Sequence, residues 1–133
     1  MNINDLVPDL KICQEAKEKG VVIESAFKYF KFSLNKDYLL QFDPTNDFMT
    51  LSGELEDKVS APLTDDILKM LPWTIEMNGL PLYLTIQMQR EVYCVGYERR
   101  AVYDNNYHFV DKKLSNALLL LATKLMEEGI IKI

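Results

Sequence analysis

The sequence predicts one α+β domain, with a mostly antiparallel sheet and three helices packed on one face of it. Apolar residues recur at helical spacing near both ends of the chain and in a short central stretch. The two intervals between them alternate in the manner of strands, and the second contains an Asn-Gly pair that is typical of a hairpin. The 133 residues suffice for a single domain over residues 1–133, of which we expect only 1–5 to be loose.

The N-terminal helix is predicted over about residues 8–19. Pro8 fits the first turn of a helix, where its missing N–H is not needed, and Asp9 favours the positive N-terminal end. Gly20 readily takes the positive φ that ends a helix. These three residues therefore indicate both ends of the helix.

Strands and a short helix are predicted next. The aromatic, alternating stretch from 24 to 43 predicts two strands around a polar turn, and a third strand is expected within residues 48–55. The central helix begins at the N-cap candidate Thr64 and ends before Pro72, because proline does not continue a helix.

The second group of strands begins with a hairpin. Asn78 and Gly79 both tolerate the positive φ that a two-residue hairpin turn requires. The strands that follow alternate with a period of two, which fits a sheet that is covered on one side. The residues expected to share a face in each strand are Leu82, Leu84, Ile86 and Met88, and then Tyr93, Val95 and Tyr97.

A leucine-rich helix is predicted near the C-terminus, with Asp111 as its N-cap and Gly129 just past its end. Leu119 and Leu120 fall outside its main apolar stripe, on opposite flanks. Residues 130–133 are too apolar for a free end, so we expect them to pack or pair. The main stripe comprises Leu114, Ala117, Leu118, Leu121 and Leu125.

The charge balance argues against nucleic acid as a general partner. The chain has 15 Lys and Arg against 20 Asp and Glu and a pI of about 4.9, whereas binding through phosphates needs surplus positive charge. The first residues do not resemble a signal peptide, and the longest apolar run, residues 117–122, is far shorter than the ~20 residues that span a bilayer. We therefore expect a cytoplasmic protein with reduced cysteines.

Residues suited to catalysis are scarce. His108 is the only histidine, and an enzymatic site would have to bring it together with Asp104 or Asp111. Cys13 and Cys94 lie in predicted helix and strand, where free cysteines are commonly small buried hydrophobes. An enzyme with such a dispersed site is the least favoured hypothesis.

No metal or cofactor site is predicted. Residues 43–54 match several ligand positions of an EF-hand loop, but Phe48 stands where that loop needs glycine. Asp65 and Asp66 are explained by the positive end of the central helix, and adjacent helical residues point 100° apart. We therefore expect neither cofactor nor catalysis.

Four short motifs are distributed over residues 7–97. They are Val-Pro-x-Leu at 7–10, a helix of the form Ala-Pro-x-Thr ending in Leu-Pro at 61–72, an Ile-Glu hairpin with Gly and Tyr-Leu-x-Ile at 75–86, and Tyr-x-Val-Gly-Tyr at 93–97. Together they resemble a group of small uncharacterised proteins encoded by bacteriophages and prophages of gut-type bacteria, although Pro81 departs from the pattern. The motifs are caps, turns and core positions. The resemblance therefore implies a phage or prophage origin in a bacterial host, and no activity.

The leading functional hypothesis is a small non-enzymatic protein that binds a protein partner or a second copy of itself, as in a homodimer. The residues expected to form its partner surface are Tyr83, Leu119, Leu120, Ile131 and Ile133, since the pattern does not clearly bury them. The alternative is a nucleic-acid accessory protein with a local basic and aromatic patch. Its basic residues would be Lys28, Lys31, Lys36, Arg99 and Arg100.

Overall fold

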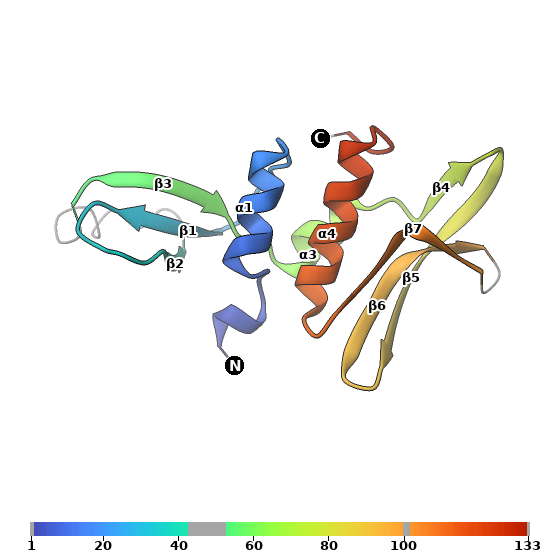
Figure 1. Cartoon of the computed structure of the whole chain (residues 1–133), viewed down its shortest axis with the longest axis horizontal. Helices are drawn as coiled ribbons and strands as arrows, with labels where there is room; N and C mark the ends of the chain where they lie inside the picture. Colours follow the sequence, from blue (N-terminus) through green and yellow to red (C-terminus); the bar gives the residue numbers. More distant parts are fainter. Residues whose placement is uncertain (1, 43–52, 100–101, 133) are drawn as a thin grey trace.

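The computed structural model divides the strands into two antiparallel sheets, with the helices between them (Figure 1). It describes residues 2–42, 53–99 and 102–132, and of 102–106 only the backbone. The α+β class and the three predicted helices are confirmed. The strands do not form one sheet with the helices on one face, because the central helix separates a three-stranded sheet from a four-stranded sheet.

The first half of the chain forms the three-stranded sheet. Its elements are the 3-10 helix η1 (Ile3–Asp5), α1 (Leu10–Glu18), β1 (Phe27–Phe32), β2 (Leu39–Phe42) and β3 (Leu55–Ser60). β1 lies in the middle, so that the buried Tyr29 is paired with Leu40 on one side and Val59 on the other. β3 begins where the predicted third strand was expected to end, and most of that predicted span lies outside the described residues.

The second half forms the four-stranded sheet, in the order β4-β5-β6-β7. Its elements are α3 (Thr64–Met70), β4 (Thr74–Met77), β5 (Leu80–Gln89), β6 (Val92–Arg99), β7 (Val102–Asp111) and α4 (Leu114–Glu127). The last strand, β7, was not predicted, and it places the C-terminal helix next to the sheet.

The two hairpin turns of the four-stranded sheet that lie within the described residues, β4–β5 and β5–β6, use positive φ angles. Asn78 and Gly79 have φ values of 56° and 78°, which confirms the predicted hairpin between β4 and β5. The turn between β5 and β6 has φ values of 48° at Arg90 and 70° at Glu91. This second turn projects beyond the ends of the helices (Figure 1).

The predicted helix ends are largely confirmed. Gly20 and Gly129 have φ values of 78° and 73° just after α1 and α4. Thr64 is the first residue of α3 rather than its cap, because Leu63 takes the extended cap conformation. The Leu63 N–H donates a hydrogen bond of 2.9 Å to the Asp66 carboxylate, which replaces the cap that we expected from Thr64.

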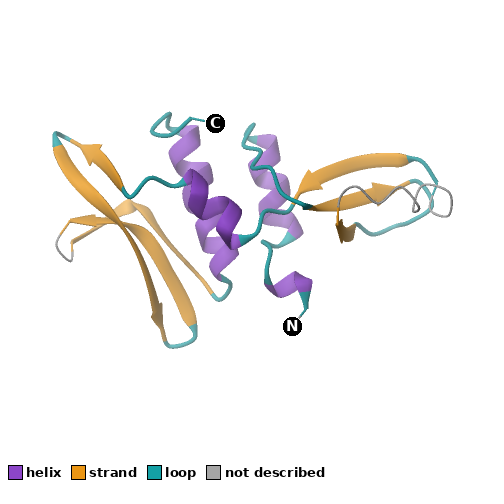
Figure 2. Cartoon of the chain, turned by 180° about the vertical axis from the view of Figure 1, so that it is seen from behind, coloured by secondary structure: helices purple, strands orange, loops and turns teal. Residues whose placement is uncertain are grey.

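The core lies between the helices and the inner faces of the two sheets. In both views α1 and α4 lie side by side, and the view from behind shows α3 in front of α4 (Figure 2). Neighbours on several sides leave Leu118, Leu121 and Leu125 of α4 with no exposed surface. Leu119, which lies off the main apolar stripe, is also buried, at 2% exposure.

Candidate binding surface

Exposed apolar side chains gather on and beside the four-stranded sheet. Trp73, directly before β4, is 82% exposed, and Met88, near the end of β5, is 64% exposed. Burying such side chains removes apolar area from water and is favourable by about 25 cal/mol per Å². The exposed large apolar residues of this region are Trp73, Leu80, Tyr83, Ile86, Met88 and Val110.

The inner face of this sheet is covered only in part. Leu84 lies opposite Tyr97, and Ile86 lies opposite Val95, in the register of β5 with β6. Tyr97 and Val95 are completely buried. Ile86 and Met88 continue the same face toward the turn that projects beyond the helices, and there they remain exposed.

β5 also has an edge that no described strand covers. β4 pairs with only the first part of β5, as far as Tyr83, and the Leu84 N–H then donates a hydrogen bond of 2.9 Å to the Trp73 carbonyl. Backbone groups alternate in direction along a strand, so Ile86 and Met88 direct theirs to the same side as Leu84. No described strand pairs with residues 85–89 on this side.

The uncovered part of β5 carries no charge. None of the ten residues Leu80–Gln89 is charged, although charged residues make up 26% of the chain. Natural proteins usually protect exposed strand edges with charges, prolines or bulges, because bare edges pair with other strands. We call Trp73 together with residues 85–89 the β5 rim.

The structure does not bring His108 and Asp111 together. His108 lies on the outer face of the four-stranded sheet, whereas Asp111, three residues later in β7, faces the opposite side. A Cβ added to Gly96 would lie 3.3 Å from Cδ2 of His108 and 2.4 Å from the carbonyl oxygen of Tyr107, so glycine makes room for the imidazole there. The side chain of Asp104 lies outside the described residues.

Both cysteines are buried free thiols. Cys13 is 2% exposed, and its Sγ donates to the Pro8 carbonyl at 3.7 Å. Burial raises the pKa of the Cys13 thiol to about 12, so it stays protonated at neutral pH. Cys94, in β6, is 9% exposed. The structure thus places Cys13 in the structural role that the sequence predicts.

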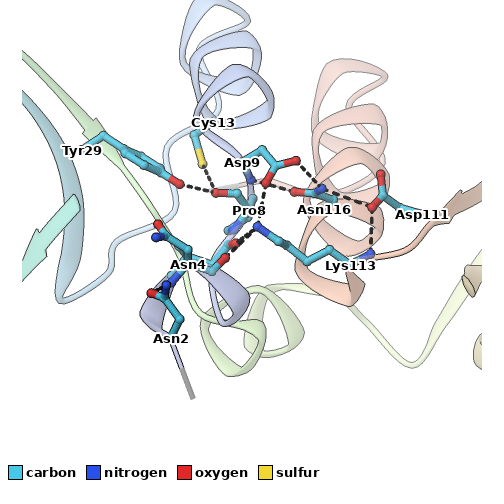
Figure 3. A network of polar contacts seen from close by, with 10 residues as sticks. Asn2, Asn4, Pro8, Asp9, Cys13, Tyr29, Asp111, Lys113 and Asn116 are labelled. Atoms are coloured by element: carbon cyan, nitrogen blue, oxygen red, sulfur yellow. Dashed lines mark hydrogen bonds and ion pairs between the residues drawn. The ribbon is translucent and has the colours of Figure 1, made fainter. Parts of the chain in front are cut away.

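A polar network joins the N-terminal segment to the start of α4 (Figure 3). Asn116 is 3% exposed; its Oδ1 accepts from the Asp9 backbone N–H at 2.7 Å, and its Nδ2 donates to Oδ2 of Asp9 at 2.9 Å. Lys113 Nζ donates to Oδ1 of Asp9 at 2.6 Å and to the Asn4 carbonyl at 2.7 Å. Asp111 accepts from the Lys113 backbone N–H at 2.8 Å, and Lys113 is the N-cap of α4, a position we expected Asp111 to fill.

This network is a clamp between the N-terminal segment and α4. Its side chains are engaged with one another and with backbone groups, and the hydrogen bond from Lys113 holds the pKa of the Asp9 carboxyl below its ordinary value. The clamp also fixes η1 at the end that we expected to be loose. Residues about a hundred positions apart in sequence are thereby tied together.

The predicted basic patch is divided between the two sheets. Lys28 and Lys31 lie in β1, and Lys36 follows that strand, whereas Arg99 ends β6 in the other sheet (Figure 1). Lys31 forms an ion pair of 3.1 Å with Glu56. The structure therefore does not join these side chains into one positive surface, and Arg100 lies outside the described residues.

The predicted partner surface is also dispersed. Tyr83 is exposed on the outer face of the four-stranded sheet, but Leu119 is buried in the core, so its assignment to an exposed patch was wrong. Leu120 is half-buried in a groove between α1 and α4. Ile131 is half-buried in a second groove, beside α3 and β4, and Ile133 lies outside the described residues.

Sequence reasoning missed Trp73, Ile86 and Met88 as surface residues. The alternation along this strand predicted Ile86 and Met88 on the covered face of the sheet. The sequence did contain one signal of an edge suited to pairing, the lack of charge along β5. Strand edges that remain unpaired usually carry charged residues.

Comparison with known protein families, curated proteins and solved structures finds no match. Within the described residues, no group of three or more His, Cys, Asp or Glu side chains could hold a metal ion. None of the described helices is long and apolar enough to span a membrane.

Proposed function

We propose that this protein acts without catalysis, by binding another macromolecule through the β5 rim. The observation that carries this proposal is the 82% exposure of Trp73 beside a strand edge that no described strand covers. Tryptophan and methionine are enriched at protein interfaces, and buried tryptophans often supply much of the binding energy. The predicted phage origin stays a prediction, and the proposed binding role does not depend on it.

The chemistry of the rim favours a protein partner. Exposed Ile86 and Met88 offer apolar area, and their backbone groups offer hydrogen bonds to an added strand. Phosphate groups would need lysines or arginines, and none occurs in β5. The rim therefore selects a partner by apolar contact and strand pairing.

Site-specific photocrosslinking tests this proposal. The crosslinking amino acid p-benzoylphenylalanine would replace Met88 in one variant and exposed Lys36, beside the three-stranded sheet, in a matched control, in cells that carry the gene. We expect discrete protein adducts from position 88 and none from position 36. Adducts from position 36 alone, or nucleic-acid adducts there, would contradict the proposal and favour the basic-patch alternative.

A further inference from the structure

We infer that the protein bound at the β5 rim is a second copy of this chain, paired edge to edge with the first about a two-fold axis. This inference rests on the proposed function and names its partner. Three independent features of the chain support it: its total surface area, the direction of its backbone groups, and the way β4 ends at Trp73.

The chain exposes more surface than a monomer of its mass. Its accessible area is 8385 Å² for 15.4 kDa, whereas the usual scaling with mass gives about 7,200 Å². The excess is roughly 1,200 Å², and a stable interface of standard size buries about 800 Å² per partner. The two sheets standing apart on either side of the helices account for the large surface (Figure 1).

The uncovered edge of β5 can pair with the same edge of a second copy. Ile86 and Met88 direct their N–H and C=O groups outward, so antiparallel pairing would place Ile86 opposite the partner's Met88, and Met88 opposite the partner's Ile86. Each such pair exchanges both of its backbone hydrogen bonds. Gln87 then faces the partner's Gln87 at the two-fold axis. Because residues 85–89 are uncharged, no like charges meet across this contact.

The position of β4 fixes the length and register of the contact. β4 and Trp73 occupy the space beside the first half of β5, so a second β5 can pair only with residues 85–89. The partner's turn at Arg90 and Glu91 then reaches Trp73. The exposed Ile86 and Met88 of both copies then lie side by side on the inner face of the joined sheets, where each Ile86 contacts the partner's Met88 and part of their apolar area is removed from water.

Solution mass tests the dimer, and one substitution tests its surface. Light scattering after size exclusion is expected to give twice 15.4 kDa for the unaltered chain. Met88→Lys should reduce the mass to that of the monomer, because a lysine on an uncovered edge strand discourages a second strand from pairing there. The matched control Val110→Lys alters a residue of 51% exposure in β7, away from the rim, and should leave the dimer intact.

Disulfide formation tests the register. Residues at a non-hydrogen-bonded pair are about 4.5 Å apart at Cα, within the range for a disulfide, so Gln87→Cys should crosslink two copies under mild oxidation. Thr85→Cys should not, because Thr85 would face the partner's Gln89. The native cysteines are both buried, which limits their interference.

The outcomes separate the two proposals. A dimer that dissociates with Met88→Lys and crosslinks with Gln87→Cys supports the inference. A monomeric chain that still forms adducts with a different protein from position 88 overturns the dimer and leaves the proposed function standing. A dimer that neither responds to Met88→Lys nor crosslinks through Gln87→Cys overturns this interface. A monomer without any adduct from position 88 overturns both proposals.

Discussion

The two sheets are fastened to the helical core in the same way. In the three-stranded sheet the Tyr29 hydroxyl donates to the Pro8 carbonyl at 2.8 Å, just before α1. In the four-stranded sheet the Tyr97 hydroxyl donates to the Pro72 carbonyl at 2.6 Å, just after α3. Both tyrosines are buried, and burial raises the pKa of both hydroxyls, to about 12 for Tyr29. On its core-facing side, each sheet is therefore held to a helix by a buried tyrosine that donates to a proline carbonyl.

Their edges differ. β3, at one edge of the three-stranded sheet, contains Glu56, Asp57 and Lys58 in succession, and Asp57 pairs with Lys17 at 2.6 Å. β5 contains no charge and leaves half of one edge uncovered. Charges discourage a second strand from adding to an edge, so their absence from β5 indicates an edge suited to pairing. The β3 edge is thus protected by charges, whereas the uncovered half of the β5 edge is not.

The clamp joins the N-terminal end of α1 to α4, so we expect the two regions to unfold as one unit. Asn116→Ala removes bonds to the Asp9 backbone, the Asp9 carboxylate and the Asp111 carboxylate. We expect it to lower the free energy of unfolding by about 2–3 kcal/mol, because a partly buried backbone N–H and two carboxylates lose a hydrogen-bond partner. Urea denaturation followed by circular dichroism measures this loss.

The neighbouring residue provides the control for the clamp. Ser115 is 2% exposed, and its hydroxyl has no hydrogen-bond partner among the described residues. Ser115→Ala should change the free energy of unfolding by no more than about 0.5 kcal/mol, or raise it slightly. Equal effects of the two substitutions would show that the clamp does not hold the halves together.

Local features of the fold could be predicted from the sequence, and long-range pairings could not. Gly20, Gly129 and the Asn78-Gly79 turn act within a few residues of themselves, so their patterns were sufficient. The division into two sheets depends on which strands meet across long stretches of chain, and alternation alone does not specify partners. Leu119 was misassigned because α4 is packed on several sides, whereas a stripe analysis assumes one buried side.

Predicting the candidate surface also required knowing which strands lie next to one another in the fold. Lys31 and Arg99 were grouped by residue type, but they belong to different sheets. Ile86 and Met88 follow the core pattern of Leu82, yet they continue past the end of the helices and meet solvent. Periodicity identifies the face of a strand, and only the packed structure shows how far that face is covered.

The next largest loss of stability should come from removing the hydrogen bonds donated by the Tyr97 and Tyr29 hydroxyls. Comparing the two losses tests whether both bonds contribute equally. Tyr97→Phe leaves the Pro72 carbonyl without its tyrosine donor and should cost about 1.5 kcal/mol. Tyr29→Phe should cost less, about 0.5–1 kcal/mol, because the Cys13 thiol also donates to the Pro8 carbonyl. Thermal and urea unfolding of both variants measure the difference. A larger loss for Tyr29→Phe would contradict this assignment.

The smallest expected effect distinguishes the charged edge from the uncharged one by its response to acid. Hydrogen bonds from Lys17 and Tyr38 hold the pKa of the Asp57 carboxyl below its ordinary value of 3.8. A carboxyl with a lowered pKa in the folded state stabilises the protein above pH 3.8, and this contribution is lost as the pH falls further. Because the pair is partly exposed and screened by solvent, we expect less than about 1 kcal/mol.

Unfolding of Asp57→Asn and the unaltered chain should therefore differ at pH 7 and converge near pH 2. Tyr38→Phe removes one of the donors to Asp57 and should show a smaller difference with the same pH dependence. Residues 85–89 contain no titratable group, so Met88→Lys should affect association at pH 7 without reproducing this loss at low pH. A difference between Asp57→Asn and the unaltered chain that is the same at both pH values would show that the edge of the three-stranded sheet is not stabilised by its charges.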